Sequence, residues 1–142
     1  MIENVLFDVS KGSQISIFLD NEPGALSKVC RLLGEKDINI HGLTVADGID
    51  HGYLRMVVDG EKEAEKILDA AGYMAFVREI MLIEISNIPG ALGVVTTILS
   101  ENSVNMDYAY CAGGPNVDRG LVVVYVDDVD KAINCLSRSV AD

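Results

Sequence analysis

The segment Asn21-Glu22-Pro23-Gly24-Ala25-Leu26 returns 66 residues later as Asn87-Ile88-Pro89-Gly90-Ala91-Leu92. At the same offset, the apolar and polar positions of residues 15–40 match those of residues 81–106. Two additional residues near Gly113-Gly114 raise the offset to 68 for the rest of the chain. A match of this extent indicates that one structural unit of about 65–70 residues is present twice.

Each repeat has the periodicity of a ferredoxin-like α+β unit with the order βαββαβ, in which both helices cover one face of an antiparallel sheet. Asn21 and Glu22 are expected to cap the first helix, and Gly34 with the polar residues 35–37 to end it. Residues 47–52 have the composition of a hairpin loop. The elements expected in the first repeat are strand Gln14–Asp20, helix Leu26–Leu33, strands Asn39–Ala46 and Tyr53–Val58, helix Glu61–Ala71 and strand Met74–Arg78.

The second repeat lacks its last strand. Residues 138–142 are too few and too polar to form it, whereas Val5-Leu6-Phe7-Asp8-Val9 is an apolar run without a partner. We therefore expect this N-terminal segment to pair at the vacant edge of the second repeat, which removes an aggregation-prone edge. The other elements expected there are strand Met81–Ser86, helix Gly90–Glu101, strands Asn105–Ala112 and Arg119–Asp127, and helix Asp128–Ser137.

Composition and charge argue against several classes of protein. The chain has 22 acidic and 11 basic residues and a net charge of −11, which would repel a nucleic acid, so no nucleic acid partner is expected. No apolar run approaches the roughly 18–20 residues of a membrane span, and Met1-Ile2-Glu3-Asn4 lacks the basic start of a signal peptide. A cytoplasmic protein without membrane association is therefore expected. The three cysteines include no CxxC pair, which favours reduced thiols.

The Asn-x-Pro-Gly segments resemble the ACT domain, a regulatory module that binds amino acids. The likeness includes Asn39-Ile40 and Asn105-Met106 at the start of a strand, and it covers about residues 13–79 and 80–137. It implies a tandem ACT protein whose two sheets join side by side, with small ligands at the junction. Its expected parts are an N-terminal strand (1–12), a first ACT unit (13–79) and a second ACT unit (80–142). The chain departs from the pattern because no catalytic domain is attached and the second unit lacks its own last strand.

In the ACT family the ligand lies against the loop between the first strand and the first helix, and against the start of the second strand. The Pro-Gly step suits an amino acid because it opens a helix whose first N–H groups are unpaired and attract a carboxylate. Carried onto this chain, the resemblance implies ligand-binding roles for Asn21, Gly24, Ala25, Leu26, Asn39, Ile40, Asn87, Gly90, Ala91, Leu92, Asn105 and Met106.

A purely structural role for the same residues is also compatible with the sequence. Asn21 or Asn39 can accept a hydrogen bond from an α-ammonium group while Leu26 and Ile40 line a pocket. However, Asn-x-Pro-Gly is also a good strand-to-helix turn with asparagine as the cap, and Leu26 and Ile40 also suit a core.

Two further groups of residues have weaker patterns. His41 and His51 flank Asp47 and Asp50, but their spacing matches no metal site, so no metal is expected. Gly113-Gly114-Pro115-Asn116 has the composition of a phosphate-binding loop, but it lies between two strands rather than before a helix. A turn is therefore favoured there.

The sequence contains no nucleophile elbow, P-loop or dinucleotide-binding fingerprint, so no enzymatic activity and no cofactor are expected. We interpret the chain as a non-catalytic, allosteric regulatory protein that binds an amino acid or a similar small molecule and forms a homodimer. The alternative is a regulatory subunit or interaction module that binds an amino-acid biosynthetic enzyme. A third interpretation, a small ferredoxin-like enzyme, requires a reactive side chain in the cleft.

Overall fold

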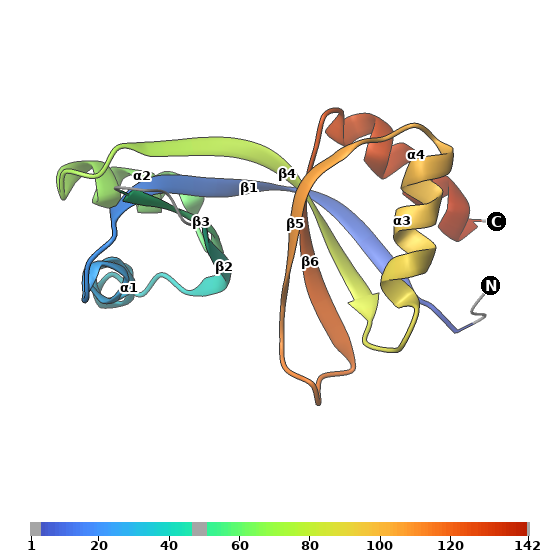
Figure 1. Cartoon of the computed structure of the whole chain (residues 1–142), viewed down its shortest axis with the longest axis horizontal. Coiled ribbons are helices and arrows are strands. Elements are labelled where there is room, and N and C mark those ends of the chain that lie inside the picture. The colour runs from blue at the N-terminus through green and yellow to red at the C-terminus, as the bar shows by residue number, and fades with distance from the viewer. Residues whose placement is uncertain (1–3, 47–50, 142) are drawn as a thin grey trace. The chain divides into compact units, whose positions relative to one another are not determined.

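The computed structural model describes residues 4–46 and 51–141. Hydrogen-bonded strands follow the order β2-β3-β1-β4-β6-β5. This arrangement confirms the ferredoxin-like α+β fold, present twice. The elements are β1 Phe7–Asp20, α1 Ala25–Glu35, β2 Ile40–Ala46, β3 His51–Val58, α2 Glu61–Ala70, β4 Ala75–Ser86, α3 Ala91–Glu101, β5 Met106–Ala112, β6 Arg119–Val126 and α4 Val129–Ala141 (Figure 1). The expected loop at 47–52 falls partly on residues 47–50, which lie outside the described residues.

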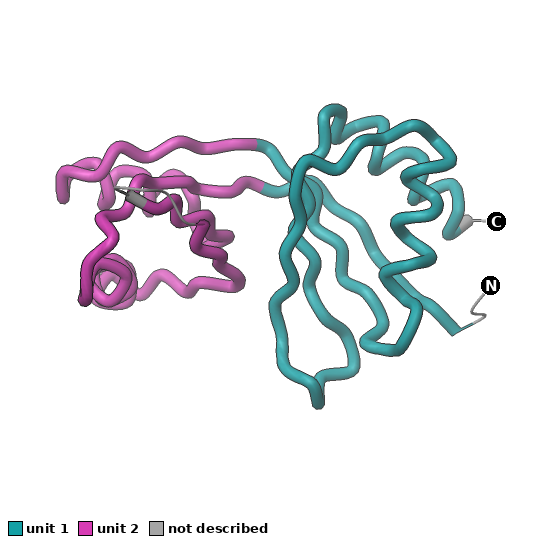
Figure 2. Tube along the Cα trace, in the orientation of Figure 1, with its two compact units in different colours: residues 1–12, 79–142 teal, residues 13–78 magenta. Residues whose placement is uncertain are grey.

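The chain divides into two compact units (Figure 2). The first-repeat unit is residues 13–78 (magenta), and the second-repeat unit joins residues 1–12 to residues 79–142 (teal). Both boundaries fall inside long strands, so β1 and β4 each contribute residues to both units. The expectation of separate strands was therefore wrong, because Phe7–Asp20 is one strand and Ala75–Ser86 is another.

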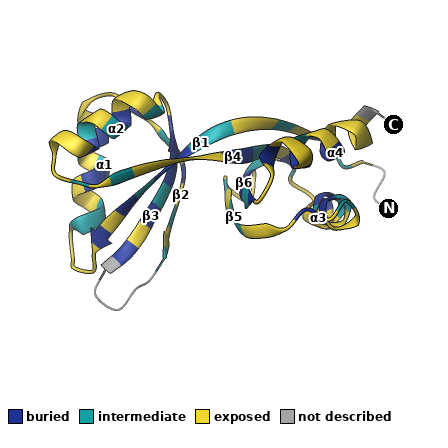
Figure 3. Ribbon diagram, turned by 90° about the horizontal axis from the view of Figure 1, so that it is seen from above, coloured by how far each residue is buried: buried dark blue, intermediate teal, exposed yellow. Residues whose placement is uncertain are grey.

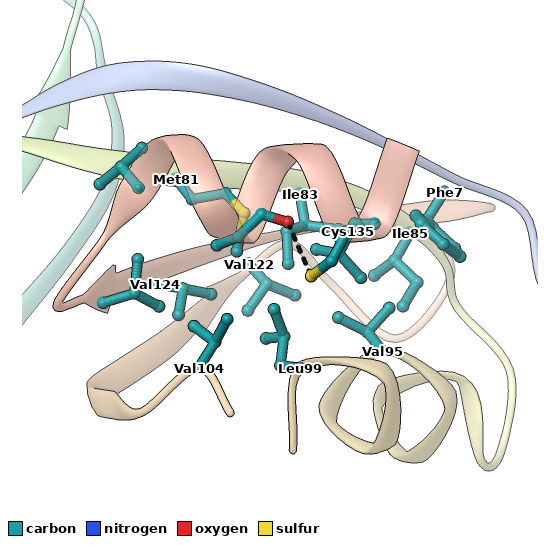
Figure 4. Packing of buried hydrophobic residues seen from close by; sticks show 14 of the residues in the cluster. Phe7, Met81, Ile83, Ile85, Val95, Leu99, Val104, Val122, Val124 and Cys135 are labelled. Atoms are coloured by element: carbon teal, nitrogen blue, oxygen red, sulfur yellow. Dashed lines mark hydrogen bonds between the residues drawn. The ribbon is translucent and has the colours of Figure 1, made fainter. Parts of the chain in front are cut away.

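Each unit has its own apolar core between its helices and its sheet. In the first-repeat unit, Val29 and Leu33 of α1 pack with Leu68 of α2 over the sheet. In the second-repeat unit, α3 and α4 cover a cluster to which Phe7 of β1 also belongs (Figure 4). Figure 3 shows the helices of both units buried along one side and exposed along the other, as expected for amphipathic helices. No helix among the described residues is long and apolar enough to cross a membrane.

The N-terminal segment is held against the rest of the second-repeat unit by hydrogen bonds and an ion pair. The N–H of Ser86 donates to the carbonyl of Leu6 at 2.9 Å, and the N–H of Leu6 donates to Oγ of Ser86 at 2.9 Å. Asp8 forms an ion pair with Arg119 of β6 at 2.9 Å. The ring of Phe7 is 8% exposed. The segment therefore supplies both a strand beside β4 and part of the core.

Further along β1, Lys11 and Gly12 also belong to the second-repeat unit. The Lys11 ammonium lies 2.7 Å from the carboxylate of Asp130 in α4 and 3.6 Å from that of Glu79, and its hydrogen bond with Asp130 raises the pKa of Lys11. Gly12 lies inside the strand, where a Cβ atom would come within 2.6 Å of Cδ1 of Leu82. Glycine at this position therefore makes space for a side chain of the neighbouring strand.

One expectation about a helix end was wrong, because α4 continues to Ala141 rather than Ser137. α1 ends at Glu35, among the residues expected to close it. Asp37 has a left-handed φ of 59°, and the N–H groups of Asp37 and Ile38 donate to the carbonyls of Gly34 and Leu33, both at 3.0 Å. This Schellman closure, rather than a glycine, ends α1.

Deleting residues 1–10 should promote self-association, because β4 of the second-repeat unit would lose the strand beside it and expose main-chain groups. Size-exclusion chromatography with light scattering tests this expectation. Phe7→Ala is the matched variant, because it keeps the strand but removes a buried ring. It should lower the unfolding free energy by about 3–5 kcal/mol in chemical denaturation without adding larger species. A truncated protein with the oligomeric state and stability of the full chain would contradict the prediction.

Candidate functional site

The start of α3 leaves main-chain donors without acceptors. Gly90 precedes the helix with a left-handed φ of 85°, and no side chain caps the helix. The first N–H bonded inside the helix is that of Val94, which donates to the carbonyl of Gly90 at 3.2 Å. The N–H groups of Leu92 and Gly93 come before it and have no acceptor within the helix. They lie at the positive end of the helix dipole, where an anion is stabilised.

Asn87 does not cap α3, which corrects the interpretation of this asparagine as a helix cap. Its side-chain amide instead donates to the carbonyl of Val117 at 2.9 Å, with longer contacts to those of Pro115 at 3.4 Å and Gly114 at 3.5 Å. Its backbone N–H donates to the carbonyl of Asp118 at 2.9 Å. Asn87 therefore ties the β4–α3 loop to the loop between β5 and β6.

These two loops and the first turn of α3 line a half-open cavity of about 320 Å³, which we call the effector cavity after the small ligand that the ACT resemblance implies. Its walls are residues 85–88 and 90–93 on one side, and residues 111–114, 117 and 120–122 on the other. Among the residues implied by the resemblance, Asn87, Gly90, Ala91 and Leu92 meet here. The hairpin loop was missed as part of the site because it was interpreted only as a turn. The sequence did distinguish this loop, because the second repeat has two more residues there than the first.

A second, apolar cavity of about 250 Å³ lies between α3 and the sheet of the same unit. Leu92, which also lines the effector cavity, lines it together with Met106, a further residue implied by the resemblance. Asn105 lies outside both cavities, in a shallow groove with Met106 near the end of α3. The second-repeat unit thus gathers five of its six implied residues around two adjacent cavities.

The six implied residues of the first-repeat unit lie in different surroundings. Gly24, with a φ of 89°, caps α1 without a side-chain bond, so the capping role expected for Asn21 and Glu22 was wrong. Gly24 lines a groove along α1 that also contains Lys28 and Arg31. Asn21 and Asn39 are exposed. The remaining three residues, Ala25, Leu26 and Ile40, pack against the core. For Leu26 and Ile40 this is the packing that the structural alternative expected.

Of the histidines and acidic residues considered for a metal site, His41 alone has a described side chain. Nε2 of His41 lies 2.5 Å from Oδ1 of Asp59, so this histidine pairs with a single carboxylate. Asp47 and Asp50 lie outside the described residues, as does the side chain of His51. No group of three or more metal-ligating side chains occurs among the residues that the structure describes.

The chain resembles known proteins over most of its length. The family model for the ACT domain pair matches residues 11–139. The acetolactate synthase isozyme 3 small subunit of Escherichia coli K12 is 37% identical over a region that covers 50% of this chain and 53% of that subunit. The chain therefore spans about half the length of the curated relatives it matches.

Solved structures extend the likeness to the whole fold. Protein BT0572 from Bacteroides thetaiotaomicron is 30% identical with a TM-score of 0.85, and the match covers 92% of this chain and 90% of that one. The ligand-free regulatory subunit of aspartate kinase from Thermus thermophilus has a TM-score of 0.72 at 17% identity, covering 97% of this chain and 98% of that one. This second match shows the fold alone.

Replacing Asn87 with alanine should loosen the β5–β6 loop, because the side-chain bonds to three loop carbonyls are lost. Amide hydrogen exchange measured by mass spectrometry should be about five- to tenfold faster at residues 113–118, corresponding to a loss of about 1 kcal/mol. Asn21→Ala changes the equivalent residue of the first repeat and is the matched control, which should leave residues 113–118 unaffected. Equal exchange of this loop in the Asn87→Ala protein and the unmodified protein would show that Asn87 does not hold it.

Proposed function

Because the chain belongs to the ACT domain pair family, we propose that it is a non-catalytic regulatory protein that binds an amino acid in the effector cavity. The observation that carries the proposal is the convergence of Asn87, Gly90, Ala91 and Leu92 with the β5–β6 loop around one cavity. The volume of about 320 Å³ is at the lower end of the range typical of small-molecule sites.

The chemistry of the cavity walls suits a zwitterion. The N–H groups of Leu92 and Gly93 are placed to receive a carboxylate at the start of α3. The side-chain oxygen of Asn87 forms no hydrogen bond with a described residue, because only its amide nitrogen is used by the loop. An α-ammonium group can donate to this oxygen. The two charged groups of an amino acid thus have separate partners on one wall.

The lining also supports binding rather than catalysis. Its side chains include a serine, an asparagine and a thiol, Ser86, Asn87 and Cys111, but no histidine, acidic or basic residue. The hydroxyl of Ser86 already donates to the carbonyl of Leu6 at 3.1 Å. A nucleophile in this cavity would therefore have no general base beside it among the described residues.

A thermal-shift screen of the twenty amino acids tests the proposal. A ligand at 100 times its dissociation constant should stabilise the protein by about 2.7 kcal/mol and raise the melting temperature by several degrees. Gly90→Asp should then weaken binding at least tenfold in calorimetry, because its side-chain carboxylate would repel the ligand carboxylate at the start of α3. Gly90→Asn is the matched control, since asparagine has the same size, tolerates a positive φ and lacks the charge.

The Gly90→Asn protein should retain more affinity than the Gly90→Asp protein, while circular dichroism of both stays unchanged. Gly24→Asp reports separately whether the first-repeat unit contributes a second site. Full affinity in the Gly90→Asp protein would place the amino acid elsewhere.

A second candidate function is protein docking, either to another copy of the chain or to a biosynthetic enzyme. An aromatic cluster in the first-repeat unit favours it. Phe18, Tyr53 and Phe76 are 40%, 43% and 47% exposed. The ring of Phe18 lies 5.0 Å from that of Tyr53 and 6.1 Å from that of Phe76. Phe18 and Tyr53 are paired across β1 and β3, next to the buried pair Ile17 and Leu54. Because neighbouring residues of a strand point to opposite faces, the cluster lies on the sheet face away from the helices.

We propose that this aromatic face joins two copies of the chain in a homodimer, since exposed aromatic groups of this kind mark interfaces. The double variant Tyr53→Ser/Phe76→Ser should halve the mass measured by light scattering at micromolar concentration. Val140→Ser removes an apolar side chain that is 55% exposed on α4, and it should leave the mass unchanged. A monomeric unmodified protein would refute the dimer. If that monomer instead retains a biosynthetic enzyme during purification and the double variant does not, the face is a docking site for that enzyme.

A further inference from the structure

The cavity beneath α3 is apolar almost throughout. Ile83, Val95, Leu99 and Val124, all nearly fully buried, form part of its walls. Thr96 is the only residue with a hydroxyl or other strongly polar side chain among those that line it. Its hydroxyl donates to the carbonyl of Leu92 at 2.8 Å, so its proton is already used by the helix and only its oxygen remains as an acceptor. No charged residue lines the cavity within the described part of the chain.

The apolar cavity adjoins the effector cavity. Leu92, Cys111 and Val122 line both, so a molecule held at the start of α3 has the apolar cavity directly beside it. Leu92 is 45% exposed and Met106 is 37% exposed, although both contribute to the apolar walls. A flexible methionine at such a position can adapt to apolar groups of different shape.

A cavity of this kind selects its occupant by polarity. An apolar occupant gains contacts with the lining atoms and removes their surface from water. A charged or amide group would lose hydration there and could gain at most one hydrogen bond from a side chain, with the hydroxyl oxygen of Thr96, at a cost of several kcal/mol. An alkyl or aryl group would gain contacts in the same space.

We propose that the apolar cavity receives the side chain of the bound amino acid, so that the effector belongs to the class with apolar side chains of several carbon atoms. The inference rests on the proposed function, because the effector cavity must hold the carboxylate and ammonium groups of the same molecule. Leu92 and Met106 then determine specificity by contact with the side chain.

Calorimetry with the unbranched series alanine, 2-aminobutyrate, norvaline and norleucine tests this inference. Affinity should rise about fourfold for each added methylene, because each buries additional apolar surface. The heat capacity of binding should become more negative along the series. Lysine is the matched probe for norleucine, since the two chains have the same number of carbon atoms but lysine carries an ammonium group, and it should bind at least a hundredfold more weakly.

Ala109 lines the cavity, and Ala109→Leu places additional carbon atoms there, so it should reduce the gain in affinity for each added methylene. If this variant is unstable, Met106→Ala provides the complementary test, because it enlarges the cavity and should shift the optimum towards longer side chains. Equal affinities from alanine to norleucine, or lysine binding as tightly as norleucine, would overturn the side-chain inference but leave amino acid binding intact. Failure of every amino acid to bind overturns the proposed function and the inference together.

Discussion

The pairing of β1 with β4 is the constraint on which the rest of the structure depends. Residues 13–20 of β1 and 75–78 of β4 lie in the first-repeat unit, whereas residues 7–12 and 79–86 of the same strands lie in the second. Neither sheet is complete without both strands, because a missing strand would leave main-chain N–H and C=O groups at an open edge. β4 also leads directly into the loop before α3, so the effector cavity depends on the same pairing.

The second constraint is the left-handed glycine before α3. Because Gly90 begins the helix without a side-chain cap, Asn87 is available for the carbonyl groups of the β5–β6 loop. The helix start and the loop consequently become opposite walls of one cavity. A conventional asparagine cap would satisfy a helix N–H group and compete with an incoming carboxylate for it. The local backbone conformation thus leaves anion-binding groups available where the cavity forms.

The proposed function and the side-chain inference divide recognition between the two adjoining cavities. Main-chain donors at Leu92 and Gly93 and the side-chain oxygen of Asn87 suit groups that every amino acid carries, so in this proposal they supply affinity without choosing among side chains. The apolar cavity beneath α3 would supply the choice through polarity and volume. Discrimination between two apolar side chains that differ by one methylene is modest, whereas rejection of a charged side chain is strong.

The sequence by itself determined the duplication, the fold and the approximate bounds of the elements, because apolar periodicity and turn residues act over a few neighbouring positions. It also drew attention to both Asn-x-Pro-Gly segments. Only the tertiary structure decided that β1 and β4 are each continuous, that Asn87 binds a loop rather than a helix end, and that Leu92 lies between two cavities. The position of Asn87, for example, depends on its contact with Val117. Partners separated by 30 residues leave no local pattern in the sequence, since chain folding alone brings them together.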